Sequence, residues 1–415
     1  MSALTAPSVT SPQFAARQPF ERLRIVIAHN AYQQSGGEDS CVAAETAMLK
    51  AYGHHVVPYT VSNDEIHGMS RMELASRTLW SAPAYRELRA LFREVRPHVA
   101  HFHNTFPLIS PAAYLAARRE RVAVVQTLHN YRWFCCNAVF FVDGNICQEC
   151  LGKLVPWRGV LKRCYRGSRV ASAAVAAMIG THKMLGTWHH AIDTYIALSH
   201  ASRAKLIEGG LDANRIVVKP NFVYPDPGEG RGGGGYCLYV GRFSAEKGLL
   251  TLLQAWRSPG LLRPLKIVGT GPMAAAVEAA AAGNPHIQVL GARAPEAVYD
   301  LLGRAEFLIV PSECFETFGR VVAEAFAKGT PVLAADIGGL GEIVADGENG
   351  LLFRSGDAAD LADKARHLFA DPVRLRQMRK RARAAFERNY TVDQNHTRLM
   401  SIYQRVLPRD AAITA

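Results

Sequence analysis

The sequence contains no long apolar run. None of its apolar stretches approaches the roughly 20 residues that a membrane-spanning helix needs. Its first residues, MSALTAPSVTSPQFAARQPF, include no apolar segment of the kind found in secretory signal peptides. We therefore expect residues 1–21 to form a flexible tail, and we expect a cytoplasmic protein whose membrane association is limited to peripheral contact at the inner face.

Acidic residues are missing from one stretch of the chain. Positions 151–190 hold no Asp or Glu, but they hold three aromatic residues (Trp157, Tyr165, Trp188) and the basic residues Lys153, Arg158, Lys162, Arg163, Arg166, Arg169 and Lys183. This composition is typical of a membrane-surface element, and it is also found on the basic face of a globular domain. The net charge of +12 favours anionic partners.

A second Cys-x-x-Cys pair is also missing. The chain has eight cysteines, and a structural zinc site is conceivable at Cys136, Cys147, Cys150 and Cys164. Without a second pair, ordinary buried thiols are the simpler interpretation. A disulfide framework is not expected, because no secretory signal is present.

The arrangement of apolar runs predicts the fold class. At 415 residues the chain exceeds one ordinary core, so two domains are expected. Strand-like runs alternate with helical stretches such as Ser40–Ala51, which predicts an α/β protein with parallel sheets. The runs are Leu23–His29, His54–Val61, His98–His103, Val122–Leu128 and Thr194–Leu198, then Tyr236–Val240, Leu265–Val268, His286–Leu290, Phe307–Val310 and Pro331–Ala335.

A segment rich in Gly and Pro, VYPDPGEGRGGGG at 223–235, separates the two series and reads as a linker. We therefore predict an N-terminal domain at 22–222 and a C-terminal domain at 236–391. Ligands of open parallel sheets bind at the carboxyl ends of the strands, so the facing edges of the two domains should form a cleft.

Three strand-to-loop junctions carry the residues expected of a phosphate and sugar site. Tyr236–Val240 runs into GRFSAEKG, which places Arg242 and Lys247 where a diphosphate would lie. Leu23–His29 runs into SGGE, whose glycines allow a ligand close to the backbone. The third junction, SECFET, carries Glu316 and precedes a helix predicted for Phe318–Lys328, with Thr317 as its N-cap.

The two acids of the element Glu316-x7-Glu324 fall one in the loop and one inside the helix. A loop position lets Glu316 lean over the helix N-terminus, where unpaired amides favour an anion. The arrangement suits a ligand with phosphate at the helix end and hydroxyls on both sides, such as a nucleotide sugar. In the alternative interpretation both acids are solvated surface residues.

These motifs together resemble glycosyltransferase family 4. The C-terminal half of that family is matched by Gly241-Arg-x4-Lys247-Gly, by ETFGRVVAEAFAKGTPVLA and by GGLGEIVADGENGLLF at 338–353. Its acceptor half is matched by Gly36-Gly37, Val125-Gln-Thr-Leu-His129-Asn and Ile196-Ala-Leu-Ser199. The resemblance spans about residues 22–405 and implies the GT-B fold: two Rossmann-like α/β/α domains facing a cleft. In that fold the last helix, here Val392–Val406 within 392–415, crosses back onto the N-terminal domain.

The resemblance also implies roles by position. Arg242 and Lys247 would hold the donor diphosphate, and Glu324 the ribose hydroxyls. Glu316 would bind hydroxyls of the transferred sugar with the backbone amides of Phe318 and Gly319.

From the N-terminal domain, His129 would reach the donor sugar, and Gly37 would lie in the loop that closes under the phosphates. Thr317 and Asn130 depart from the family, which commonly has proline and aspartate there.

The implied activity is that of a retaining enzyme that needs neither cofactor nor metal. It would move a hexose from GDP-mannose or a UDP-hexose to a glycan or lipid-linked acceptor in cell-surface polysaccharide synthesis. The basic stretch 151–190 favours an acceptor at a membrane face. A nucleotide-sugar epimerase or phosphorylase of the same fold is the closest alternative.

Three further patterns suggest other functions. Leu265–Ala274 contains Gly-x-Gly-x-x-Ala between a strand and a helix, as in NAD-dependent dehydrogenases, but no acid follows the strand His286–Leu290 to bind a ribose. The net charge alone would allow a nucleic-acid binder, yet the basic residues 374–388 are more simply a solvated helix face, so no nucleic acid is expected. His101 and His103 could suggest a metal; alternatively, His103 and Asn104 line the acceptor cleft.

Overall fold

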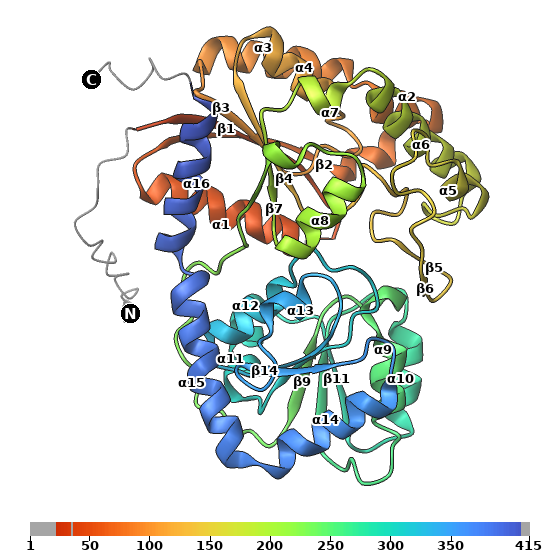
Figure 1. The fold of residues 1–415 in the computed structure, drawn as a ribbon. Coiled ribbons are helices and arrows are strands. Elements are labelled where there is room, and N and C mark those ends of the chain that lie inside the picture. Colours follow the sequence, from red (N-terminus) through yellow and green to blue (C-terminus); the bar gives the residue numbers. More distant parts are fainter. Residues whose placement is uncertain (1–21, 35, 408–415) are drawn as a thin grey trace, which may run out of the picture.

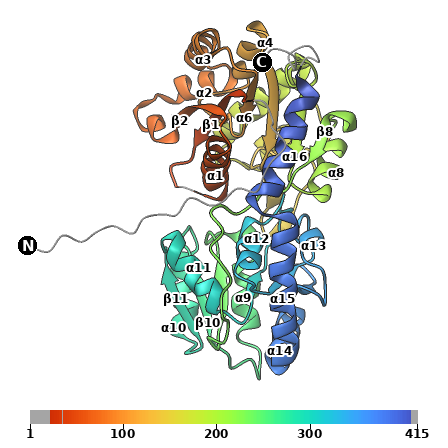
Figure 2. The same cartoon turned by 90° about the vertical axis from the view of Figure 1, so that its left-hand side faces the viewer.

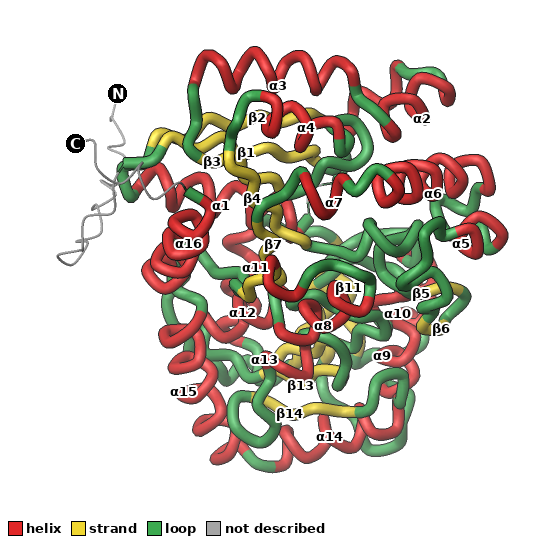
Figure 3. The backbone as a smooth tube through the Cα atoms, turned by 45° about the horizontal axis from the view of Figure 1, so that its top comes forward, coloured by secondary structure: helices red, strands yellow, loops and turns green. Residues whose placement is uncertain are grey.

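The structure, a computed structural model, describes residues 22–34 and 36–407 (Figure 1). The predicted tail at 1–21 lies outside the described residues. The chain forms two α/β domains, each built on a six-stranded parallel sheet, as the sequence predicts. Figure 3 shows the strands of both sheets in yellow with red helices around them.

The N-terminal sheet has the strand order β2-β1-β3-β4-β7-β8. Its central strands β1, β3, β4 and β7 are largely buried, because helices cover both faces of a parallel sheet, whereas the edge strand β2 is mostly half-buried or exposed. The strands and the small hairpin are β1 Arg24–Ala31, β2 His55–Ser62, β3 Val99–Phe102, β4 Ala123–Leu128, β5 Phe141–Val142, β6 Asn145–Ile146, β7 Thr194–Ala197 and β8 Ile216–Val218. The helices are α1 Gly37–Ala51, α2 Arg71–Leu79, α3 Ala82–Val95, α4 Ala112–Arg119, α5 Trp157–Leu161, α6 Arg169–Met184, α7 Thr187–His190 and α8 His200–Glu208, with 3₁₀ turns at Asn63–Gly68 and Ala213–Arg215.

The C-terminal sheet has the order β11-β10-β9-β12-β13-β14. Its strands are β9 Cys237–Val240, β10 Leu265–Val268, β11 Ile287–Gly291, β12 Leu308–Val310, β13 Val332–Ala335 and β14 Gly350–Phe353. Its helices are α9 Leu249–Ala255, α10 Ala274–Ala282, α11 Pro295–Arg304, α12 Arg320–Ala327, α13 Leu340–Ile343, α14 Ala358–Ala370 and α15 Pro372–Asn389, with a 3₁₀ turn at Ala245–Lys247. The ten predicted strands are confirmed with shifts at their ends, whereas the short edge strands β8 and β14 were not predicted.

Strand order fixes where each sheet can hold a ligand. In the C-terminal sheet the chain moves outward from β9 through β10 to β11 and then returns to β12 on the other side of β9. The loops after β9 and β12 therefore lie side by side at the carboxyl edge, which is the usual ligand position in such sheets. In the N-terminal sheet the corresponding reversal lies at β1 and β3.

The last helix, α16 (Val392–Val406), belongs to the core of the N-terminal domain. Its buried residues Leu399, Met400, Ile402 and Tyr403 join a cluster formed by α1 and one face of the N-terminal sheet. Figure 2 shows α15 running along the C-terminal domain and α16 continuing over the N-terminal domain. The predicted crossover helix is thus confirmed. Within the described residues, no helix is long and apolar enough to cross a membrane.

The segment 223–235 is not a free linker. Gly230, Gly232 and Gly234 donate backbone hydrogen bonds to Lys328, Gly303 and Arg304 of the C-terminal domain. A Cβ on Gly230 would lie 2.2 Å from the Cα of Gly303, so glycine is needed for this close packing. The segment is fixed to the C-terminal domain because its glycines let two backbones meet.

The two connections between the domains lie next to each other. Phe222 packs in the N-terminal core and Val223 in the C-terminal core, so the first connection is at this peptide. The second lies between the end of α15 and the start of α16. The amide of Val223 donates to the carbonyl of Tyr390 over 3.1 Å, so the two connections are bonded to each other.

Candidate active site

The loops after β9 and β12 bring Lys247 and Glu316 together. Lys247 Nζ lies 2.5 Å from Glu316 Oε1, and Ser312 Oγ donates to the same oxygen over 2.8 Å. The loops meet because Gly248 has no side chain: a Cβ there would lie 1.7 Å from the carbonyl oxygen of Pro311.

Both members of this pair are charged. Burial would lower the pKa of Lys247, but the Glu316 carboxylate raises it. Burial would raise the pKa of Glu316, but Lys247 and the hydrogen bond from Ser312 lower it. An ammonium beside a carboxylate at a ligand-binding sheet edge can hold a phosphate and a hydroxyl next to each other.

Arg242 lies in the same loop but is not part of the pair. Its side chain is exposed, and its carbonyl accepts a hydrogen bond from the Tyr239 hydroxyl over 2.9 Å. No described residue forms an ion pair with it.

The helix after Glu316 begins later than predicted. The first helical residue of α12 is Arg320, and Gly319 precedes it in the left-handed conformation with φ of 85°. Thr317 is therefore not the N-cap. Its Oγ1 instead donates to the carbonyl oxygen of His129 in the other domain over 2.9 Å, and its own carbonyl accepts from Ser199 Oγ over 2.7 Å.

Phe318, the other residue predicted to offer a backbone amide, has a buried side chain in the C-terminal core. Its backbone lies in the loop between Glu316 and the start of α12, as does that of Gly319.

Glu324 lies inside α12, as predicted, and is paired. Arg320 Nε lies 3.1 Å from Glu324 Oε1, and Arg320 Nη1 donates to the carbonyl of Gly37 over 3.1 Å. Burial raises the pKa of Glu324, and Arg320 offsets part of this effect. Arg320 thus links the predicted ribose-binding acid to the opposite domain. Sequence reasoning missed it, although its spacing of four from Glu324 on a helix was a usable signal.

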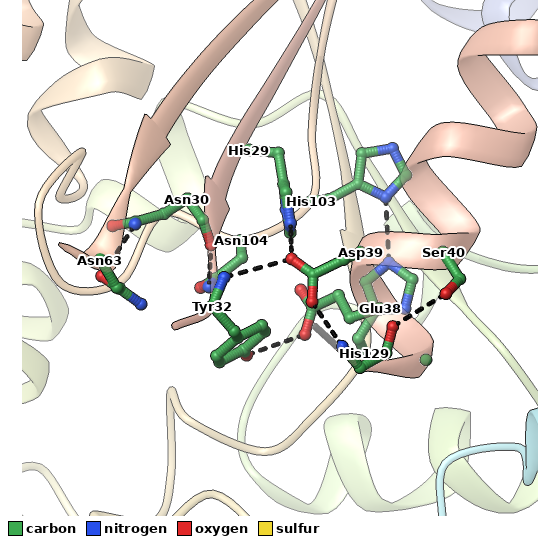
Figure 4. Close-up of polar contacts among 12 residues, drawn as sticks. His29, Asn30, Tyr32, Glu38, Asp39, Ser40, Asn63, His103, Asn104 and His129 are labelled. Atoms are coloured by element: carbon green, nitrogen blue, oxygen red, sulfur yellow. Dashed lines mark hydrogen bonds and ion pairs between the residues drawn. The ribbon is translucent and has the colours of Figure 1, made fainter. Parts of the chain in front are cut away.

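Gly37 is not a loop residue. It is the first residue of α1, with Gly36 as the N-cap, so the helix starts three residues before the predicted Ser40. Asp39 closes this end by accepting from the Gly36 amide over 2.8 Å, and its other oxygen lies 2.9 Å from His29 Nε2 (Figure 4). The N-terminus of α1 contacts the C-terminal domain, because the carbonyl of Gly37 accepts the hydrogen bond from Arg320.

Glu38, whose role the sequence did not indicate, lies in the first turn of α1. It accepts a hydrogen bond from the Tyr32 hydroxyl over 2.9 Å (Figure 4). Burial raises the pKa of Glu38 to about 7, and this effect exceeds the opposing influence of His29. A carboxyl that titrates near neutrality beside a candidate site is typical of functional groups.

His129 follows β4 and meets His103, which follows β3. His103 Nδ1 lies 2.9 Å from His129 Nε2 (Figure 4). Burial lowers the pKa of His103 to about 4 and lowers that of His129 well below its ordinary value, so both are neutral at pH 7. The two residues line a pocket together with Asn104 and Asn130. That this pocket is the acceptor cleft stays a prediction.

The cysteine sulfurs are not gathered into a metal-binding cluster in the described residues. Among the described residues, only Glu45, His101 and His103 place three ligand atoms within 4.8 Å of one another. Cys136, Cys150 and Cys164 are instead thiols whose pKa is raised by burial. The structure thus favours ordinary buried thiols over the zinc site.

The dinucleotide fingerprint has a structural explanation. A Cβ on Gly269 would lie 1.9 Å from the carbonyl oxygen of Gly241, and one on Gly271 would lie 2.5 Å from that of Phe243. Both positions therefore require glycine, because the backbone of the loop that carries Lys247 packs directly against them. A pyrophosphate could not occupy that space, which removes the main argument for a dehydrogenase.

Comparison with known structures defines the class. The structure of Anabaena HepE in complex with UDP and glucose superposes with a TM-score of 0.64 over 92% of this chain and 99% of that one, at 18% identity. This similarity shows the fold, which is the GT-B fold of glycosyltransferases.

Sequence comparison defines the family. The model described as "Glycosyltransferase Family 4" matches residues 35–226, and that described as "Glycosyl transferases group 1" matches residues 234–371. Together they cover both domains, and the chain belongs to these glycosyltransferase families.

Curated relatives match part of the chain. An uncharacterized glycosyltransferase of Methanocaldococcus jannaschii is 35% identical over 39% of this chain and 46% of its own length. The phosphatidyl-myo-inositol mannosyltransferase of Mycobacterium leprae is 32% identical over 54% of this chain and 62% of its own length. The chain thus spans about half the length of these relatives.

Proposed function

We propose that this protein is a retaining glycosyltransferase that moves a hexose from a nucleoside-diphosphate hexose to a glycan or lipid-linked acceptor. The observation that carries the proposal is the Lys247–Glu316 pair, which stands where the C-terminal strand order reverses. A donor diphosphate would take Lys247 as its counter-ion. The released Glu316 carboxylate would then accept hydrogen bonds from hydroxyls of the sugar.

The proposed mechanism is electrostatic. The acceptor hydroxyl would attack the anomeric carbon on the face from which the diphosphate leaves, and its proton would pass to the leaving phosphate oxygen, so the configuration would be retained. Charge then grows on the leaving phosphate, where Lys247, Arg242 and the amides before α12 would stabilise it. Since two cations serve this role, we propose that the transfer requires no divalent ion.

The donor is proposed to be a UDP-hexose or GDP-mannose. The Anabaena neighbour was crystallised with UDP and glucose, and one relative is a mannosyltransferase, so the comparisons support a nucleotide sugar and leave both bases open.

A thermal-shift screen of UDP, GDP, ADP and TDP at equal concentration tests the donor class. A nucleotide that binds only the folded protein raises its melting temperature, by mass action. We expect UDP or GDP to give the largest shift and Lys247→Ala to abolish it. The absence of any shift with all four nucleotides would refute the proposed donor class.

The acceptor is proposed to lie at an anionic membrane surface in polysaccharide synthesis. Exposed apolar side chains around α5 and α6, among them Trp157 at 50% and Val170 at 72%, stand beside the basic residues of 151–190. Two of the three aromatics are not available: Trp188 is buried and Tyr165 is half-buried. The surface is therefore more aliphatic than the sequence predicted.

A further inference from the structure

A chain of polar residues runs inward from His129. His129 Nε2 bonds His103 Nδ1 over 2.9 Å, and His103 Nε2 lies 3.2 Å from Glu45 Oε1. The second Glu45 oxygen accepts from Lys219 Nζ over 3.0 Å. The side chains of His103, Glu45 and Lys219 are buried, so their protons are shielded from water.

This cluster contains the three ligand atoms that could hold a cation, but a positive charge already lies beside it. The Lys219 ammonium already pairs with Glu45. Both ring nitrogens of His101 are engaged, Nδ1 with the Tyr403 hydroxyl and Nε2 with Thr127 Oγ1, each over 2.8 Å. A second cation would therefore be repelled by Lys219. The Glu45 carboxylate is left to face the rings of His101 and His103, which lie 3.0 and 3.2 Å from its Oε1.

The charge of Glu45 determines which ring nitrogen of His103 carries the proton. Burial would raise the pKa of Glu45, but Lys219 and His101 hold it well below its ordinary value, so the group is a carboxylate that only accepts. His103 Nε2 lies 3.2 Å from the Glu45 carboxylate, outside regular hydrogen-bond geometry, and it has no other polar partner among the described residues. We infer that Nε2 carries the proton of the neutral ring. A lone pair there would face a negative charge.

The positions of the ring protons of His103 and His129 follow from the neutral charge of both rings. Neutral His103 has one proton, on Nε2, so its Nδ1 is an acceptor and His129 Nε2 must donate to it. Neutral His129 then has a lone pair on Nδ1. No described residue bonds this nitrogen, which leaves it for a ligand.

We propose that Glu45 and His103 are positioning residues that hold His129 as the neutral tautomer protonated at Nε2, with Nδ1 presented as a hydrogen-bond acceptor to the donor sugar. The choice of ligand rests on the proposed function. An acceptor nitrogen binds a sugar hydroxyl and repels a carboxylate. The site should therefore select neutral hexoses over hexuronates.

The tautomer can be measured without any activity. Nitrogen-15 NMR of protein labelled in histidine distinguishes a protonated from an unprotonated ring nitrogen, and the His129 signals are those lost in His129→Asn. At pH 7 we expect His129 to be protonated at Nε2 only. Protonation at Nδ1, or at both nitrogens, would overturn the proposal.

A variant tests whether the Glu45 charge sets the tautomer of His129. Glu45→Gln keeps the shape but removes the charge, and pairing it with Lys219→Met avoids a buried unpaired ammonium. In the double variant we expect a mixture of both His129 tautomers at an unchanged fold. If the His129 signals of this variant matched those of wild type, Glu45 would not be the group that sets the His129 tautomer.

The consequence for specificity is tested by calorimetry with UDP-glucose and UDP-glucuronate. We expect wild type to prefer UDP-glucose by about tenfold, the usual scale of one hydrogen bond. His129→Ala should lose this preference, and His129→Asn, whose amide oxygen can take the place of Nδ1, should keep it. An unchanged ratio in His129→Ala would refute the selectivity. Failure of both compounds to bind would instead refute UDP as the nucleotide of the donor. The NMR spectrum would still test whether Glu45 and His103 hold His129 in the proposed tautomer.

Discussion

At the scale of single residues, the chemistry of the site depends on Lys247 and Glu316. These side chains are 32% and 15% exposed, so neither belongs to the core, and removing either should leave the fold intact. We predict that Lys247→Ala and Glu316→Ala each lower turnover by about 100- to 1,000-fold, because each would remove a contact that stabilises the transition state. Transfer rate and melting temperature are measured together.

Arg366→Ala is the matched control for this prediction, because it removes an exposed ion pair with Asp363 on α14, in the same domain. The control should keep both the rate and the melting temperature. Near-normal turnover in the Lys247 or Glu316 variant would exclude that residue from the site.

Glu38 makes stability depend on pH. Its pKa rises from 4.5 to about 7 on folding because of burial. An acid with a raised folded pKa binds its proton more tightly when folded, so its contribution is present below pH 4.5 and is lost as the pH rises to 7. We predict that the melting temperature of Glu38→Gln exceeds that of wild type by a margin that grows between pH 4.5 and 7 and is constant above. Parallel profiles across this range would contradict the shifted pKa.

At the scale of elements, the surface around α5 and α6 is expected to bind anionic lipid. Each basic side chain near such a surface contributes about 1 kcal/mol. We predict that the protein floats with liposomes containing anionic lipid at low salt, and that Arg163→Gln with Arg166→Gln reduces the bound fraction several-fold. Both residues are exposed.

The control for flotation removes the same charge elsewhere. Arg376→Gln with Lys380→Gln changes two exposed basic residues on α15, in the other domain. It should leave flotation unchanged. Equal loss in both double variants would mean that only net charge matters, and no lipid dependence in wild type would refute membrane docking.

At the scale of the whole molecule, the Thr317 hydroxyl helps to join the domains. Thr317→Val keeps the shape but leaves the carbonyl of His129 without this donor. We predict a fall in turnover of up to about tenfold, since one such bond contributes about 1 kcal/mol, with little change in melting temperature. Thr397→Val, which removes a hydroxyl bond to a carbonyl within α16, is the control and should have normal turnover.

The whole site is also predicted to work without a divalent ion. Lys247 and Arg242 supply the positive charge that a bound metal would otherwise give to the leaving diphosphate. Transfer in excess EDTA should equal transfer without it. Activity that EDTA removes and that added Mg²⁺ or Mn²⁺ restores would refute the metal-free mechanism.

The sequence by itself determined the elements and the family. Strands such as Val122–Leu128 were predictable because a buried parallel strand requires a short apolar run, which is a local property. The motifs around Lys247 and Glu316 could also be recognised in the sequence, because each lies within a single strand-to-helix junction. In a parallel sheet all such junctions lie at the carboxyl edge, and the strand order places the two loops after β9 and β12 next to each other.

Only the tertiary structure decided which groups the side chains meet. Thr317 read as an N-cap by its place before a helix, yet its partner is His129, 188 positions away. The Gly-Pro segment read as a linker, yet its glycines pack against Gly303. Local periodicity carries no information on such contacts, because they depend on how two finished domains meet. Glu45 could not be predicted for the same reason: the Lys219 charge that keeps it ionised comes from a distant part of the chain.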